Sequence, residues 1–125
     1  MYLCLTRYSK VYDVYNNLPN GLYRMGSGFY IDNDDKIYVP ISDGYVNYYG
    51  SDIYSIGDNR LYKDSNNAVY QIGGTRVYID DYGRIYQIGN ARIQRDDRGY
   101  AYEFITSERV TRIYRDDYGR IYQVY

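Results

Sequence analysis

The chain has 125 residues and a formal net charge of −1, and it contains 22 Tyr, one Cys and no His or Trp. This length predicts a single domain spanning residues 1–125. The near-neutral charge argues against a nucleic-acid-binding protein, and Cys4 has no second cysteine for an intrachain disulfide. The N-terminal segment contains Arg7 and Lys10 and lacks a long apolar run. We therefore expect no signal peptide and no membrane span, with a cytoplasmic location by default.

The sequence contains copies of one sixteen-residue unit, which become more regular along the chain. Five tyrosines mark the period, each sixteen residues after the last: Tyr38, Tyr54, Tyr70, Tyr86 and Tyr102. The segments that match the pattern, the first only loosely, are 3–12, 28–40, 44–56, 60–73, 76–89, 92–105 and 112–125. We accordingly divide the domain into irregular repeats over residues 1–58 and regular repeats over residues 59–125. A fixed internal period predicts units that bury their surface by stacking on neighbouring units.

Each unit alternates two five-residue strand blocks with two three-residue turn blocks, as in Arg76–Gly89, which reads RVYIDDYGRIYQIG. The strand blocks alternate and are rich in Tyr, Ile and Val, which is typical of β-strands. In the first turn block, Gly83 supplies the positive φ that a three-residue hairpin needs, and Asn67 and Gly50 are the candidates for that position in two other units. The second block, residues 89–91, also has turn chemistry.

This pattern predicts an all-β protein, an antiparallel meander of about 12–14 short strands built from sixteen-residue hairpin repeats. We expect the meander to curl into a barrel, a flattened barrel or a sandwich. A β-solenoid with one coil per unit is the alternative, although it would stack Arg on Arg and Asp on Asp.

A three-residue turn after Asp80 would pair Tyr78 with Tyr86, and a second three-residue turn would pair Ile88 with Arg92. One sheet face would then carry a row of tyrosines, with Tyr30 and Tyr38 at its start and Ile88 at its border. We predict the row itself as the candidate binding surface: Tyr54, Tyr62, Tyr70, Tyr78, Tyr86, Tyr102, Tyr114 and Tyr122. The other face would alternate aliphatic residues with Lys63, Gln71, Gln87, Arg95 and Gln123. The arginines of the second half lie close to Tyr or Asp, so we expect them to pair within the sheet.

The sequence offers little catalytic or metal-binding chemistry. It has no His and no reactive Ser or Cys beside a plausible base, so we predict no enzyme activity and no cofactor. The acidic run at residues 32–35 and the Asp pairs at 80, 96 and 116 could suggest calcium. They lack a closing Glu and stand where turns favour Asp, so we predict no metal site.

The residues Tyr78, Asp80, Gly83, Arg84 and Ile85 recur as Tyr114, Asp116, Gly119, Arg120 and Ile121. This pattern resembles the YD repeats of RHS-type proteins. That family builds long curved antiparallel sheets from repeats that are not themselves catalytic. The resemblance implies a tyrosine-rich β-meander.

From these features we predict a non-catalytic structural, self-assembly or protein-interaction module. Half-apolar faces and unpaired end strands favour a homo-oligomer or filament, with the protein itself as partner. The alternative is binding of a glycan or cell-surface polymer through the tyrosine row, because tyrosine rings present flat apolar faces and a hydroxyl. Neither nucleic acid nor membrane is an expected partner.

Overall fold

The computed structural model describes residues 1–97, 101–115 and 121–124, with side chains for residues 1–97 and 103–114. The described residues form fifteen β-strands and one 3-10 turn, η1 (Arg7–Ser9), and contain no α-helix. The strands are β1 (Tyr2–Leu5), β2 (Val11–Tyr15), β3 (Tyr23–Gly26), β4 (Phe29–Ile31), β5 (Ile37–Pro40), β6 (Val46–Tyr49), β7 (Asp52–Ile56), β8 (Asn59–Lys63), β9 (Val69–Ile72), β10 (Thr75–Ile79), β11 (Ile85–Ile88), β12 (Ala91–Arg95), β13 (Ala101–Ile105), β14 (Val110–Arg115) and β15 (Ile121–Val124).

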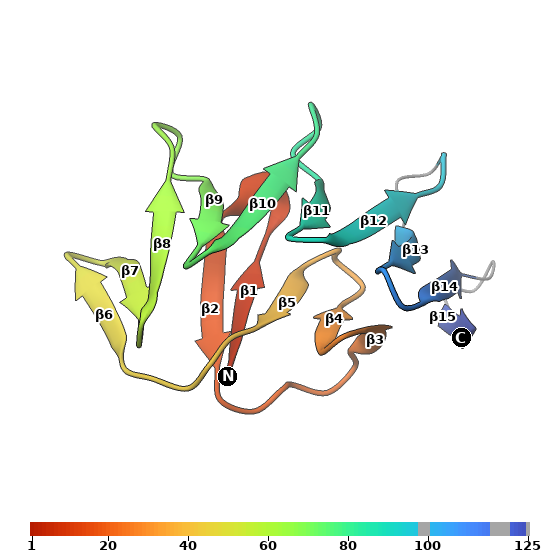
Figure 1. Cartoon of the computed structure of the whole chain (residues 1–125), viewed down its shortest axis with the longest axis horizontal. Helices are drawn as coiled ribbons and strands as arrows, with labels where there is room; N and C mark the ends of the chain where they lie inside the picture. The colour runs from red at the N-terminus through yellow and green to blue at the C-terminus, as the bar shows by residue number, and fades with distance from the viewer. Residues whose placement is uncertain (98–100, 116–120, 125) are drawn as a thin grey trace.

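The first five strands form a small antiparallel sheet in the order β2-β1-β5-β4-β3. Residues 16–22 carry the chain from β2 at one edge of this sheet to β3 at the other (Figure 1). This segment contains Pro19, Asn20 and Gly21, which interrupt a strand pattern. The sixteen-residue period therefore lapses at the place where the chain stops pairing consecutive strands.

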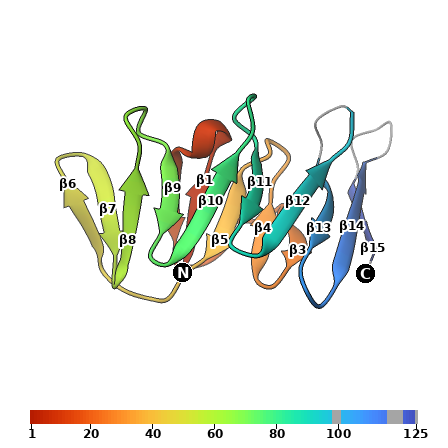
Figure 2. The ribbon, with the colours of Figure 1, turned by 45° about the horizontal axis from the view of Figure 1, so that its top comes forward.

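The other ten strands, β6 to β15, form a large sheet in which strands follow one another in chain order. Figures 1 and 2 show the small sheet lying against one face of this meander, which the chain reaches through residues 41–45. The predicted all-β antiparallel meander is confirmed. The two open sheets form a flattened sandwich and not a closed barrel, and their antiparallel pairing rules out the alternative solenoid.

The hydrophobic core lies between the two sheets. The small sheet contributes buried Leu3, Leu5, Met25, Ile31, Ile37 and Val39, and the large sheet contributes Ile56, Leu61, Val69, Ile72, Val77, Ile85, Ile88, Ala91, Ile93, Phe104 and Ile113. The rings of Phe29 and Phe104 meet across the core at 5.4 Å between centroids. Because each fully buried Ile or Leu contributes about 1.5–3 kcal/mol, this layer is the main stabilising element of the fold.

The hairpin turn at Asp80 has the predicted three-residue form. The Asp80 N–H donates to the Arg84 carbonyl at 2.9 Å, and Gly83 adopts a φ of +80°. The Asp80 carboxylate accepts the N–H groups of Tyr82 and Arg84, each at 2.9 Å, which explains why Asp stands here. Asn67 and Gly50 have φ values of +65° and +66°, as predicted for the equivalent position.

The predicted pairing of strands β10 and β11 holds at Ile79 and is wrong from Tyr78 onward. Ile79 pairs with Ile85, but Tyr78 pairs with Gln87, so Tyr86 has no residue directly opposite it and forms a β-bulge. The same shift skips four other tyrosines in their hairpins, namely Tyr12, Tyr54, Tyr70 and Tyr102.

The second turn also differs from its prediction. Ile88 pairs with Ala91 and not with Arg92, so residues 89 and 90 alone make the turn. Gly89, with a φ of +58°, takes the first position of this two-residue turn, where glycine is favoured. The bulge reverses the alternation of faces, which places Ile88 in the core and Gln87 on the tyrosine side. The inner face is therefore mainly apolar, with Arg95 on it as predicted, whereas the predicted placement of Gln71 and Gln87 on this face is wrong.

Polar contacts also join the two sheets. The N–H of Tyr8, in the β1–β2 turn, donates to the Gly83 carbonyl at 2.6 Å, and the Ser9 hydroxyl donates to the Val69 carbonyl at 2.6 Å. Arg95 of β12, whose side chain is 6% exposed, also binds Asp35 of the β4–β5 turn at 3.0 Å. The small sheet is thus held to the large one through its turns as well as its core.

Candidate functional site

The predicted tyrosine row lies on the face of the large sheet that points away from the small sheet. Tyr62 is half-buried, and the other described members are between 36% and 47% exposed: Tyr54, Tyr70, Tyr78, Tyr86 and Tyr114. The side chains of Tyr102 and Tyr122 lie outside the described residues. We call the outward surface formed by these six tyrosines and their Arg and Gln neighbours on β7 to β14 the tyrosine face.

The rings of the tyrosine face come in pairs from adjacent strands. The ring centroids of Tyr62 and Tyr70 are 6.3 Å apart and those of Tyr78 and Tyr86 are 6.0 Å apart, both within the range typical of aromatic pairs. In each pair one tyrosine occupies a paired strand position and the other is the bulge residue. The bulge therefore brings two rings together on the exposed side of each hairpin.

Tyr30 and Tyr38 are not part of this surface, contrary to their predicted place in the row. Both lie on the small sheet, where Tyr38 is buried and donates its hydroxyl to Asp32 at 3.3 Å. Cys4, which pairs with Tyr38 across the strands, is also buried, and burial raises the pKa of its thiol to about 11. A thiol in this state is a poor nucleophile.

A row of arginines runs beside the tyrosines. Arg60, Arg76 and Arg92 are exposed residues at the second positions of β8, β10 and β12. Within the described part of the chain, no carboxylate forms an ion pair with any of these three guanidinium groups, so Asp is not the partner that the predicted pairing within the sheet gives them. Arg60 lies 5.3 Å from the centre of the Tyr62 ring and Arg76 lies 5.4 Å from that of Tyr70.

The residues opposite these arginines explain why they are unpaired. Ser55 faces Arg60, Gln71 faces Arg76 and Gln87 faces Arg92, and all three of these partners are neutral. The side-chain amide of Gln71 donates a hydrogen bond to the Gly73 carbonyl, and that of Gln87 donates to the Gly89 carbonyl. At the next repeat the neutral residue is replaced by Glu103, which faces Arg112 at 4.0 Å. The sequence analysis did not identify this arginine row, because whether an arginine is ion-paired depends on the residue opposite it in the neighbouring strand. The sixteen-residue spacing of Arg60, Arg76 and Arg92 was the signal that could have revealed the row.

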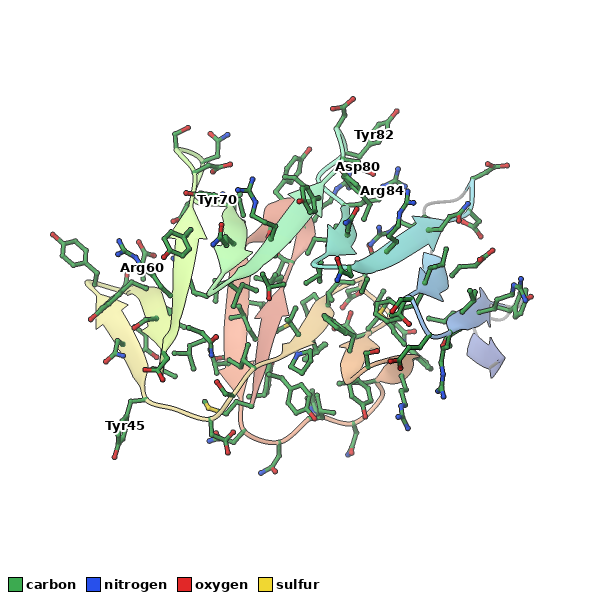
Figure 3. The ribbon with its side chains drawn as sticks, in the orientation of Figure 1. Tyr45, Arg60, Tyr70, Asp80, Tyr82 and Arg84 are labelled. Atoms are coloured by element: carbon green, nitrogen blue, oxygen red, sulfur yellow. The ribbon has the colours of Figure 1, made fainter. Side chains whose placement is uncertain are left out.

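Arg84, unlike the three arginines of the row, has a carboxylate partner. It forms an ion pair with Asp80 at 3.1 Å, as predicted, and Figure 3 shows the two side chains at the base of the β10–β11 turn, with Tyr82 at its tip. Burial raises the pKa of Asp80, but the N–H groups of Arg84 and Tyr82 and the Arg84 guanidinium outweigh it and lower the pKa below 3.8. This ion pair stabilises the turn, and the charges of Asp80 and Arg84 compensate each other.

A groove of about 420 Å³ opens beside Tyr86 on this side of the molecule. Its lining includes Arg84, Arg92 and Gln94, together with Asp80. The groove places a ring and an unpaired guanidinium, that of Arg92, around one concave surface. Such a site suits a ligand that combines an apolar surface with polar or anionic groups.

The acidic runs considered for calcium serve the turns. The Asp32 carboxylate accepts the N–H groups of Asp34 and Lys36, each at 2.9 Å, and binds the Lys36 ammonium at 3.2 Å. Asp64 accepts two backbone N–H groups in the same way. Over residues 1–97, 101–115 and 121–124 no three His, Cys, Asp or Glu side chains gather as metal ligands would.

Comparison of the chain with protein-family models, with curated proteins and with solved structures gave no match. In the described part of the chain there is no helix of the length and apolarity required to cross a membrane.

Proposed function

We propose that this protein is a non-catalytic interaction module of tandem hairpin repeats, and that the tyrosine face is its binding surface. The observation that carries the proposal is the exposure of the paired rings on a sheet whose other face is already covered by the small sheet. Rings in the core would contribute to stability alone. Paired rings left in solvent offer apolar area to a partner at little entropic cost, because tyrosine has few rotatable bonds.

The repeated character of the face supports an interaction role over an enzymatic one. An active site needs a singular convergence of a nucleophile, a base and a charge-stabilising group. On the tyrosine face the same residue types return at each hairpin, and Asp80 and Arg84 are committed to the turn. A periodic surface suits an extended partner with a repeated chemistry.

The test compares wild-type protein with a triple variant, Tyr70→Ser, Tyr78→Ser and Tyr86→Ser. Binding to an array of neutral and acidic glycans and self-association in sedimentation velocity are both measured. We expect at least one activity in the wild type and its loss in the triple variant. Tyr82→Ser is the matched control, since Tyr82 is exposed but lies at a turn tip off the face. A triple variant that behaves as the wild type would contradict the proposal.

Self-association is a second candidate function, and strand β6 favours it. In the described part of the chain β6 pairs only with β7, which leaves its other backbone edge open. Tyr45 and Tyr49 beside this edge are 89% and 84% exposed. An open edge with aromatic side chains is a template for strand addition. Val46 forms a non-hydrogen-bonded pair with Ile56, so its N–H points away from β7 to the open edge. Val46→Pro should therefore abolish any concentration-dependent sedimentation, and assembly that persists in the variant would exclude β6 as its site.

A further inference from the structure

We infer that the tyrosine face binds a linear polysaccharide that carries carboxylate groups, with Arg60, Arg76 and Arg92 as the residues that recognise its charge. This inference rests on the proposed function and names the partner class of the same surface. It is carried by the combination of three exposed, unpaired guanidinium groups with the paired tyrosine rings between them.

Two successive hairpins present the same three groups. Arg60, Tyr62 and Tyr70 form one set, and Arg76, Tyr78 and Tyr86 form the next. Both guanidinium groups lie near a ring, but in different ways: Arg60 is 5.3 Å from the centre of Tyr62 in its own set, whereas Arg76 is 5.4 Å from the centre of Tyr70 in the preceding set. A third arginine, Arg92, follows at the groove beside Tyr86. A surface repeated in this way fits a polymer whose own repeat unit has one ring surface and one charge.

The cross-strand partners of the arginines determine where the tyrosine face keeps a positive charge, and therefore that its ligand is acidic. Where the arginine faces Glu103, the sheet neutralises it, as at Arg112. Where it faces Ser55, Gln71 or Gln87, the positive charge is left for a ligand. A guanidinium binds a carboxylate through two parallel hydrogen bonds, and a tyrosine ring stacks on the apolar face of a sugar. The chemistry therefore points to an acidic glycan over a neutral one.

The spacing of the arginines separates such a polymer from nucleic acid. They stand on every second strand, so their attachment points are about 9–10 Å apart. A nucleic-acid strand carries one phosphate per ~3.4 Å of helix axis. Three arginines at this spacing would leave most phosphates uncompensated. A polysaccharide with one carboxylate per sugar carries its charges further apart than nucleic acid does, and every second carboxylate can face an arginine of the row.

The experiment measures binding of the wild type to polygalacturonate and to the same polymer fully methyl-esterified, which is neutral. We expect retention on polygalacturonate that weakens with added salt, and retention at least about tenfold weaker on the ester. A single-stranded oligonucleotide of equal total charge is the third probe. Equal binding of the acid and the ester, or stronger binding of the oligonucleotide, would overturn the inference.

Two sets of variants locate the charge. The triple change Arg60→Gln, Arg76→Gln and Arg92→Gln should lower affinity for polygalacturonate by about tenfold or more, whereas Arg112→Gln, at the position already paired with Glu103, should leave it within about twofold. Gln71→Glu with Gln87→Glu keeps every arginine but places a carboxylate opposite Arg76 and Arg92, as Glu103 stands opposite Arg112. This double variant should lose most of the acid-specific binding, with an unchanged circular dichroism spectrum.

The outcomes separate this inference from the proposed function. If the wild type binds the methyl ester as well as the acid, and the tyrosine triple variant loses both, the face is a binding surface and its charge selectivity is excluded. If the Arg→Gln triple variant binds polygalacturonate as the wild type does, the arginine row is not the recognition element. If the tyrosine variant retains all binding, the proposed function itself fails.

Discussion

The ring of Tyr8 lies directly on Gly83: a Cβ placed on the glycine would come within 2.6 Å of the ring atoms. The Tyr8 N–H donates to the Gly83 carbonyl, and Arg7 donates to the carbonyl of Tyr82 at 2.5 Å. The turn of the β10–β11 hairpin is therefore seated on the turn of the β1–β2 hairpin. Gly83 has to be glycine for two independent reasons, its φ of +80° and the absence of space above it.

Gly83→Ala should therefore lower the free energy of unfolding more than the same change at Gly50. Both glycines have positive φ, at +80° and +66°, but nothing lies within 4 Å of a Cβ at Gly50. We expect a cost of about 1–2 kcal/mol at Gly50 from backbone strain alone. At Gly83 the displacement of Tyr8 should raise the cost to about 3 kcal/mol. Urea melts of the two variants measure the difference, and equal midpoints would show that the Tyr8 contact is not stabilising.

Tyr82→Ala at the tip of the same turn should cost little, within about 1 kcal/mol. The side chain is exposed, its only described ring contact is the Arg84 guanidinium at 5.0 Å, and its carbonyl still accepts from Arg7. A larger loss than in Gly83→Val would mean that the turn register is wrong. The equivalent pair in the last repeat, Tyr118 and Gly119, lies outside the described residues.

Gly44→Ala should destabilise the sandwich through a backbone clash, where Gly74→Ala should not. A Cβ at Gly44 would lie 2.4 Å from the Cα of Gly57, so residues 41–45, which join the two sheets, would have to move away from the β7–β8 turn. A Cβ at Gly74 meets nothing within 4 Å. We expect a cost of about 2 kcal/mol at Gly44 and within about 0.5 kcal/mol at Gly74 in thermal melts. Similar melting temperatures for both variants would contradict the close approach.

Arg95→Ala should cost about 2 kcal/mol, because it leaves the partly buried Asp35 carboxylate, which is 34% exposed, without its cation. Arg95 is 6% exposed and also donates to the carbonyl of Ile85. Burial raises the pKa of Asp35, although Arg95 lowers it, so removal of Arg95 should raise that pKa further. Arg92→Ala, three residues away on the exposed face, should change stability within about 0.5 kcal/mol. Denaturant melts compare the two, and a small effect at Arg95 would show that the ion pair does not hold the sheets together.

Asp80→Asn should reduce stability at neutral pH and make stability less dependent on acid. The pKa of Asp80 in the folded protein lies below its ordinary value of 3.8, so the ionised carboxylate stabilises the fold above that value, and this contribution is lost as pH falls through the lowered folded pKa. We expect a loss of about 1 kcal/mol or more at neutral pH, which shrinks on acidification. Melts across a pH series measure the gap between variant and wild type. A gap independent of pH would exclude the carboxylate charge as its cause.

The strands and three-residue turns could be predicted from the sequence because their signals are local. Asp80, Gly83 and Asn67 have the turn conformations that their residue types favour. The bulge could not be predicted, because the segment from Ile85 to Ile88 reads equally well as a regular strand; the structure places both isoleucines in the core only by skipping Tyr86. A shift of the strand pairing by one residue moves the following side chains to the opposite face of the sheet, which is why Gln87 lies on the tyrosine side.

The division into two sheets depends on contacts that are distant in sequence. Leu5 and Ile37 pair within the small sheet, although the unit that contains Ile37 resembles the units of the large sheet. Six tyrosines of the predicted row share one face of the large sheet, whereas Tyr30 and Tyr38 lie on the small sheet. The exposure of the six follows from which face the small sheet covers, and no local pattern sets it. The unpaired state of Arg76 likewise depends on Gln71 in the neighbouring strand.

The bulge tyrosines occupy positions that the strand ladder does not use for register. Tyr54, Tyr70 and Tyr86 face no partner residue, so a different side chain at these places leaves the pairing of Ile85 with Ile79, and of its counterparts, intact. Within each short unit, the residues that set the chemistry of the surface are therefore different from the residues that set the strand pairing. A chain of this design can acquire a new specificity one hairpin at a time, by point substitution, while its scaffold stays the same.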